Sequence, residues 1–178
     1  MRKALFILGD LSDSDLDWLS QVGRRVSHVA GDHLIRAREP VSDIFILLEG
    51  RLTVQDASGR QVVASLYPGE IVGELSFLDS RPPNASVVAA ERVVALAISR
   101  ELLRARLESD SKFAAHFYRA LGVFLASRLR QTMGRLGFGA GDALEDDESV
   151  DELDPELLDQ TALAGRRFER LLARFRSG

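Results

Sequence analysis

Between about residues 25 and 98, short apolar runs rich in Val, Ile and Leu alternate with turn residues. The turns recur about every 8–12 positions, a spacing typical of antiparallel strands in a sandwich or barrel. Gly31, Gly50 and Gly69 separate several runs, and the stretch 57–60 reads as a hairpin turn. Strands are expected at residues 25–29, 33–37, 44–49, 51–55, 61–66, 71–72, 86–90 and 93–98. This pattern predicts a jelly roll closed mainly by its own hairpins.

Helical patterns flank the predicted jelly roll on both sides. A short helix is expected over residues 11–23, another over 100–107, and a long one over about 110–136. The apolar surface of the long helix is wider than a one-sided helix needs. We therefore expect one of its faces to cover the jelly roll and another to meet a second copy, with burial inside one subunit as the alternative. The fold class is mainly β with flanking helices.

The end of the chain has a different character. Residues 137–154 read as a Gly-rich and acidic linker, and ten acidic residues without a basic one lie between positions 142 and 159. Such a segment is either a solvated linker or a strap that masks the basic remainder of the chain. Residues 155–178 predict an amphipathic C-terminal helix, with Pro155 at its first position and five arginines toward its end. This helix should dock either on its own subunit or on a partner.

Several classes of protein find no support in the sequence. Cysteine is absent, and the three histidines, at positions 28, 33 and 116, match no metal-site spacing. No nucleophile elbow or phosphate loop is present, so we expect neither catalytic nor metal-binding residues and no required cofactor. No apolar stretch reaches the roughly 18 residues of a membrane span, and the N-terminal apolar run is too short for a signal peptide. A cytoplasmic protein without enzyme activity is the simplest expectation.

One segment, residues 69–88, has the composition of a ligand site. It leaves a strand, makes a short helical turn at about 74–78, and enters the next strand near Ala85. A strand that runs into a helix start aims free backbone N–H groups outward, which suits a phosphate. Glu74 at that start could accept a hydrogen bond from a sugar hydroxyl. A capped turn, in which Glu74 only stabilises the helix dipole, is the alternative.

This segment resembles the phosphate-binding cassette of cyclic-nucleotide-binding domains, whose pattern runs Gly-Glu-Leu-(small)-Leu-Leu…Pro-Arg-(small)-Ala-Thr-Val. The resemblance covers about residues 11–136, and it implies a jelly roll with a hinge helix, dimeric through the long helix, that senses cAMP or cGMP. It implies that Gly73 and Glu74 are the cassette glycine and the ribose-binding glutamate. It further implies that the backbone amides of Leu75 and Ser76 face the cyclic phosphate.

The end of the cassette departs from that pattern. Ala85 keeps a small residue, and Thr132 falls near the adenine-binding Thr of members that resemble the catabolite activator protein. The phosphate-pairing Arg, however, falls on Pro83, which is followed by Asn84. Proline has neither a side-chain donor nor a backbone N–H. Arg81 could substitute for the missing Arg, or it could be a solvated turn residue.

These observations predict a regulatory protein with its sensor domain at residues 1–136. It would form a homodimer through residues 111–136 and act in trans on an unknown protein partner, through the helix at 155–176. Specific DNA binding is not expected, because a winged helix-turn-helix takes about 70 residues and 42 follow Leu136. The leading alternative is the same fold with a degenerate ligand site, serving as an interaction or scaffold module. A metal-dependent jelly-roll enzyme and a DNA-binding regulator are the remaining alternatives.

Overall fold

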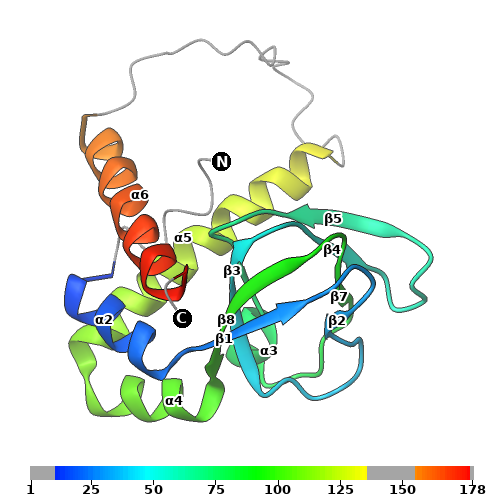
Figure 1. The fold of residues 1–178 in the computed structure, drawn as a ribbon, viewed down its shortest axis with the longest axis horizontal. Coiled ribbons are helices and arrows are strands. Elements are labelled where there is room, and N and C mark those ends of the chain that lie inside the picture. Colours follow the sequence, from blue (N-terminus) through cyan, green and yellow to red (C-terminus); the bar gives the residue numbers. More distant parts are fainter. Residues whose placement is uncertain (1–10, 136–154, 177–178) are drawn as a thin grey trace.

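The structure, a computed structural model, describes residues 11–135 and 155–176. The predicted linker over 137–154 lies outside these residues. Two four-stranded antiparallel sheets face each other, and helices cover one end of the pair (Figure 1). The strands are β1 (Arg24–His28), β2 (His33–Ile35), β3 (Asp43–Glu49), β4 (Leu52–Gln55), β5 (Val62–Leu66), β6 (Ile71–Val72), β7 (Ser86–Ala89) and β8 (Val93–Ser99). The predicted jelly roll is confirmed, with each strand within two residues of its expected bounds.

Strands that are distant in sequence are neighbours in both sheets. The first sheet has the order β1-β8-β3-β6, and the second has the order β2-β7-β4-β5. In the first sheet β3 pairs with β8 from Asp43 opposite Ser99 to Glu49 opposite Val94. The short β6 pairs with the other edge of β3, where Phe45 lies opposite Val72. This pairing places the end of β6, and the residues that follow it, beside the start of β3.

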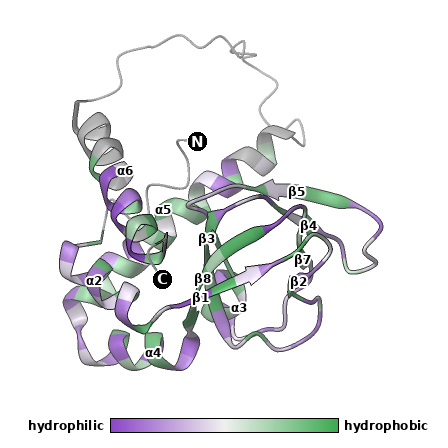
Figure 2. Ribbon diagram, viewed as in Figure 1, coloured by the Kyte–Doolittle hydropathy of each residue, from purple (hydrophilic) through white to green (hydrophobic). Residues whose placement is uncertain are grey.

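The two central strands of the first sheet are buried on both faces, which accounts for their continuous apolar sequences. Alternate residues of a strand point to opposite sides. Ile44 and Ile46 of β3 therefore join a core shared with the helices, while Phe45 and Leu47 join the core between the sheets. The same alternation holds along β8, whose apolar run is visible in Figure 2. The helices thus form a third layer on the outer face of this sheet.

The helices are α2 (Asp13–Val22), α3 (Glu74–Asp79), α4 (Arg100–Ser109), α5 (Ser111–Arg135) and α6 (Pro155–Arg176). Ser12 caps α2 through a capping box. The Asp15 amide donates to the Ser12 hydroxyl, and the Ser12 amide donates to the Asp15 carboxylate. The carboxylate of Asp110 accepts the amide of Phe113 at the start of α5. No helix in the described part of the chain is long and apolar enough to cross a membrane.

The long helix α5 has two different halves. Phe113 and Phe117 in its first half are buried in the core that α2 and the first sheet share. Toward its end, Val123, Leu129 and Met133 are exposed apolar residues. The helix therefore covers the jelly roll as expected, and its exposed apolar residues are compatible with the predicted second copy. The homodimer itself stays a prediction.

The C-terminal helix α6 lies on α2 of the same chain (Figure 1). Phe168 and Leu172 are buried there, and Phe175 is partly buried against the same core. Of the two docking alternatives that the sequence left open, the structure thus shows docking within the subunit.

Candidate functional site

A backbone turn at Gly73 starts the site. Gly73 follows β6 and precedes α3, and it adopts a left-handed conformation with φ of +89°. A Cβ atom at this position would lie 2.9 Å from the carbonyl oxygen of Asp43 in β3. Both the positive φ and this close approach require glycine. The β3–β6 pairing therefore brings the start of α3 close against β3.

The first turn of α3 has no side-chain cap, because its N-cap residue is Gly73. The first amides of a helix lack intrahelical partners and attract an anion or another acceptor. Leu75 is 61% exposed, whereas Ser76 is buried. The carbonyl of Ser76 accepts a hydrogen bond from the Arg100 guanidinium at the start of α4. This contact ties the short helix to the helical layer.

Glu74 is a buried carboxylate with a cationic partner from a distant element. It is 2% exposed, and its Oε1 lies 2.7 Å from Nη1 of Arg128 on α5. The Arg128 guanidinium also lies 5.1 Å from the centre of the Phe124 ring. Burial raises the pKa of the Glu74 carboxyl, and the charge and hydrogen bond of Arg128 oppose that rise. The site therefore holds an ion pair that joins the cassette to the long helix.

The segment after α3 carries the second half of the predicted site. Pro83 is partly buried, and its carbonyl accepts the amide of Arg38 at 2.8 Å. Ser86 accepts the amide of Ala37 through its hydroxyl at 3.0 Å. These two bonds join the segment to the turn after β2. At Pro83 the structure offers a carbonyl to its neighbour and no donor toward a ligand.

Other predicted site residues occupy different environments. Arg81 and Asn84 are exposed, Ala85 is partly buried, and the amide of Arg81 donates to the Asp79 carboxylate. Thr132 is exposed on α5, one turn beyond Arg128, and its hydroxyl donates to the Arg128 carbonyl. Residues four apart share a helix face, so Thr132 and Arg128 lie on the same side of α5. The Arg81 side chain has no described link to Glu74.

Sequence reasoning missed Arg128. The available signal was its position four residues before Thr132, on the helix face already expected to meet a ligand. Periodicity places both residues on that face, but it does not show which carboxylate lies opposite.

Two further observations bound the chemistry. Among residues 11–135 and 155–176, no group of three or more His, Asp or Glu side chains could hold a metal ion. A cavity of about 330 Å³ lies between α3, α4 and α5 and is lined by residues that include Phe77, Arg104 and Tyr118. Glu74 and Gly73 are not among its lining residues. The cavity therefore borders the cassette at α3, through residues such as Phe77, but does not include the Glu74–Arg128 pair.

The described site is thus a buried carboxylate at the uncapped start of a short helix, on the edge of a jelly roll. Residues 25–110 match the family model of the cyclic nucleotide-binding domain, and the resemblance seen in the sequence is confirmed over those residues.

Two characterised proteins are similar to parts of the chain. The Pycsar effector protein XpPycTIR of Xanthomonas perforans is 30% identical over 114 residues, which cover 64% of this chain and 36% of that protein. The acetyltransferase Pat of Mycolicibacterium smegmatis is 35% identical over 83 residues, which cover 46% of this chain and 25% of that protein. The matches thus span about a third and a quarter of these relatives.

Solved structures show the same fold. A cyclic nucleotide-binding domain from Methylobacillus flagellatus superimposes with a TM-score of 0.68 at 23% identity, covering 80% of this chain and 85% of that one. The N-terminal domain of a transcriptional regulator from Streptomyces coelicolor superimposes with a TM-score of 0.58 at 27% identity, covering 76% and 95%.

Proposed function

We propose that the chain is a non-catalytic, cytoplasmic regulatory protein whose cassette binds cAMP or cGMP and which acts in trans on a partner. The observation that carries this proposal is the buried Glu74 at the start of α3, paired with Arg128 of the long helix. A buried carboxylate is costly unless it is paired or hydrogen-bonded. Its place beside uncapped helix amides suits a ligand that presents a hydroxyl group and an anionic phosphate together.

The ligand would contact three kinds of group. A ribose hydroxyl would donate to Glu74, and the cyclic phosphate would accept from the amides of Leu75 and Ser76. Pro83 supplies no charge to that phosphate, so the Arg128 guanidinium is the described cation that already lies inside the site. Thr132, on the same face of α5, would then lie toward the base. Arg81 is exposed, and we assign it no primary role.

Binding would act on α5 because the ligand and Arg128 compete for one carboxylate. A hydroxyl that donates to Glu74 weakens its bond to Arg128, and Arg128 would turn toward the phosphate. The position of α5 relative to the cassette would therefore depend on whether the ligand is bound. A ligand-driven switch requires such a difference in contacts between the bound and free states. We further propose that two chains pair through residues 111–136, where Val123, Leu129 and Met133 are exposed.

The test is calorimetric titration of the full chain with cAMP and with cGMP, up to millimolar ligand. A bidentate Arg–phosphate contact contributes about 1.5–3 kcal/mol, so the Pro83→Arg variant should bind roughly 10- to 150-fold more tightly than the wild type. Glu74→Gln should weaken binding in both backgrounds. Absence of saturable binding by the wild type and by Pro83→Arg would contradict the proposal.

A second function is favoured by one observation, the proline at the phosphate position. If Pro83→Arg binds nucleotide and the wild type does not, the pocket is intact but has lost its anion contact. The chain would then serve as an interaction or scaffold module, with the Glu74–Arg128 pair as a structural link between α3 and α5.

A further inference from the structure

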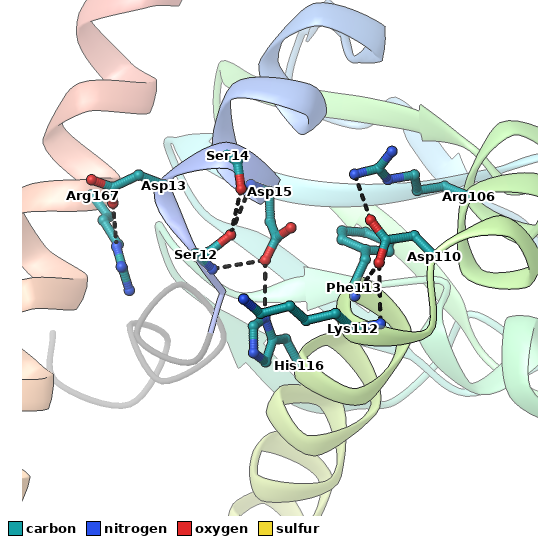
Figure 3. A network of polar contacts seen from close by, with 10 residues as sticks. All are labelled: Ser12, Asp13, Ser14, Asp15, Arg106, Asp110, Lys112, Phe113, His116 and Arg167. Carbon is teal, nitrogen blue, oxygen red and sulfur yellow. Dashed lines mark hydrogen bonds and ion pairs between the residues drawn. The ribbon is translucent and has the colours of Figure 1, made fainter.

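The α6 helix and the α2 helix present matching charged rows to each other. Arg167 donates to Asp13 at 3.0 Å, and Arg170 lies 3.5 Å from the same carboxylate (Figure 3 shows Arg167 and Asp13). One turn further along both helices, Arg174 lies 3.1 Å from Asp17 and also donates to Ser20. The pairing advances in the same direction on the two helices, so α6 runs parallel to α2.

An apolar row accompanies the charges. Phe168, Leu172 and Phe175 recur at four- and three-residue steps, the spacing of one helix face. They join the core to which Leu16 and Leu19 of α2 belong. The complementarity therefore has an apolar centre with charged pairs beside it. We call the α2 face formed by Asp13, Leu16, Asp17, Leu19 and Ser20 the α6 seat.

The exposed ion pairs of the seat contribute little to holding α6. The Arg170–Asp13 and Arg174–Asp17 pairs are at least half exposed on both sides, and exposed pairs contribute little to stability. Only Arg167 among the pairing arginines is largely covered, at 12% exposure. The buried side chains Phe168 and Leu172, with the partly buried Phe175, supply the apolar contact. A contact of this size can open without unfolding the jelly roll.

We infer that the α6 seat is a docking surface for the α6 helix of a second copy of this chain. Each copy carries one seat and one helix that fits it, so a reciprocal exchange makes two native contacts and closes with twofold symmetry. Nineteen residues separate Arg135 from Pro155, and a chain of that length reaches at most about 65 Å. The connection therefore permits α6 to reach either seat.

Concentration decides between the two arrangements. A tethered helix sees its own seat at an effective concentration of about millimolar, so dilute chains keep α6 in cis. A second contact that holds two chains together removes this advantage. The exposed apolar residues Leu129 and Met133, which are four apart and share a face of α5, offer such a contact. The exchange does not depend on a nucleotide, and its test is run without one.

Two charge-reversed chains test the exchange. One carries Asp13→Arg with Asp17→Arg, and the other carries Arg167→Asp with Arg174→Asp. In each variant the seat and the helix carry the same charge, so α6 is repelled by its own seat and by the seat of an identical copy. In an exchanged dimer of the two variants, each helix meets a seat of opposite charge. Native mass spectrometry of an equimolar mixture should show the mixed dimer in roughly tenfold excess over like dimers, since mismatched charges suppress wrong partners. Hydrogen exchange should show protected α6 amides in the mixture only.

The control is a single chain with all four substitutions, which restores the match in cis and should protect α6 at low concentration. A mixture that shows no mixed dimer, or only the statistical proportion, with protection restored in the control, overturns the inference. If a double reversal unfolds either chain, the single pair of Asp13→Arg and Arg167→Asp repeats the same comparison with half the charge change.

Discussion

Two buried carboxylates contact α5, one at each end, and they are satisfied in different ways. Asp15 of α2 is 4% exposed and lies 3.2 Å from Nδ1 of His116 (Figure 3). It also accepts the amide of Ser12 at 2.8 Å within the same turn. Glu74 is 2% exposed, and its described side-chain partner is Arg128, which comes from 54 residues away. A local capping bond and His116 together hold Asp15, whereas the described side-chain partner of Glu74 is one distant arginine.

The pKa values of the two carboxyls move in opposite directions. Burial acts to raise the pKa of Asp15, but hydrogen bonds from Ser12 and His116 outweigh it and the pKa falls. Burial also acts on Glu74, and there it outweighs the opposing effect of Arg128, so the pKa rises. A carboxylate within a capping box is part of the scaffold. A carboxylate that remains costly to ionise is a group that a ligand can satisfy better.

The largest expected effect on stability comes from removing the charge of Arg128, the partner of Glu74. Arg128→Met should leave the buried Glu74 carboxyl without its cationic partner, and should lower the free energy of unfolding by about 2–4 kcal/mol at pH 7. Adding Glu74→Gln should recover most of that loss, because the variant pair carries no buried charge. Urea unfolding measures both, with Arg128→Lys as the variant that keeps the charge. Equal destabilisation of the single and double variants would show that Arg128 stabilises by packing alone.

A smaller effect is expected at the other end. Asp15→Asn should cost about 1–2 kcal/mol, because the capping box of α2 loses its charged acceptor and its link to His116. The matched control is Gln21→Ala, an exposed residue of the same helix outside the capping box. Thermal unfolding gives the difference between them. If both variants unfold together with the wild type, the Asp15–His116 contact does not anchor α5.

The smallest effect is a difference in pH dependence. Glu74 binds its proton more tightly in the folded state, so stability falls as pH rises from about 4.5 through its raised pKa. Asp15 binds its proton less tightly when folded, so stability falls as pH drops below about 3.9. Urea unfolding between pH 3 and 7 gives the free energy of unfolding as a function of pH. Its fall above about pH 4.5 should be absent in Glu74→Gln and present in Asp15→Asn. If the free energy of unfolding of Glu74→Gln still falls above about pH 4.5, Glu74 is not the group that causes the fall.

Much of the fold could be predicted from local sequence. The strand bounds follow turn residues and apolar runs, and the α6 bounds of 155–176 follow from Pro155 at the first helical position. Gly73 and Glu74 could be predicted as cassette residues because the pattern to which they belong is contiguous in the sequence. Arg128 was not found, because its partner lies in another element and helix periodicity does not name the surface opposite. The seat of α6 was left open for the same reason.

The sequence by itself determined the jelly roll, its flanking helices and the start of the cassette, because hydrophobic period, turns and caps act over a few residues. Tertiary structure alone decided that Arg128 meets Glu74, that Pro83 offers a carbonyl to Arg38, and that α6 lies on α2. These contacts join residues 45 to more than 150 positions apart. Their existence depends on how buried surfaces and charges complement each other after the sheets have paired, and no local pattern encodes that fit.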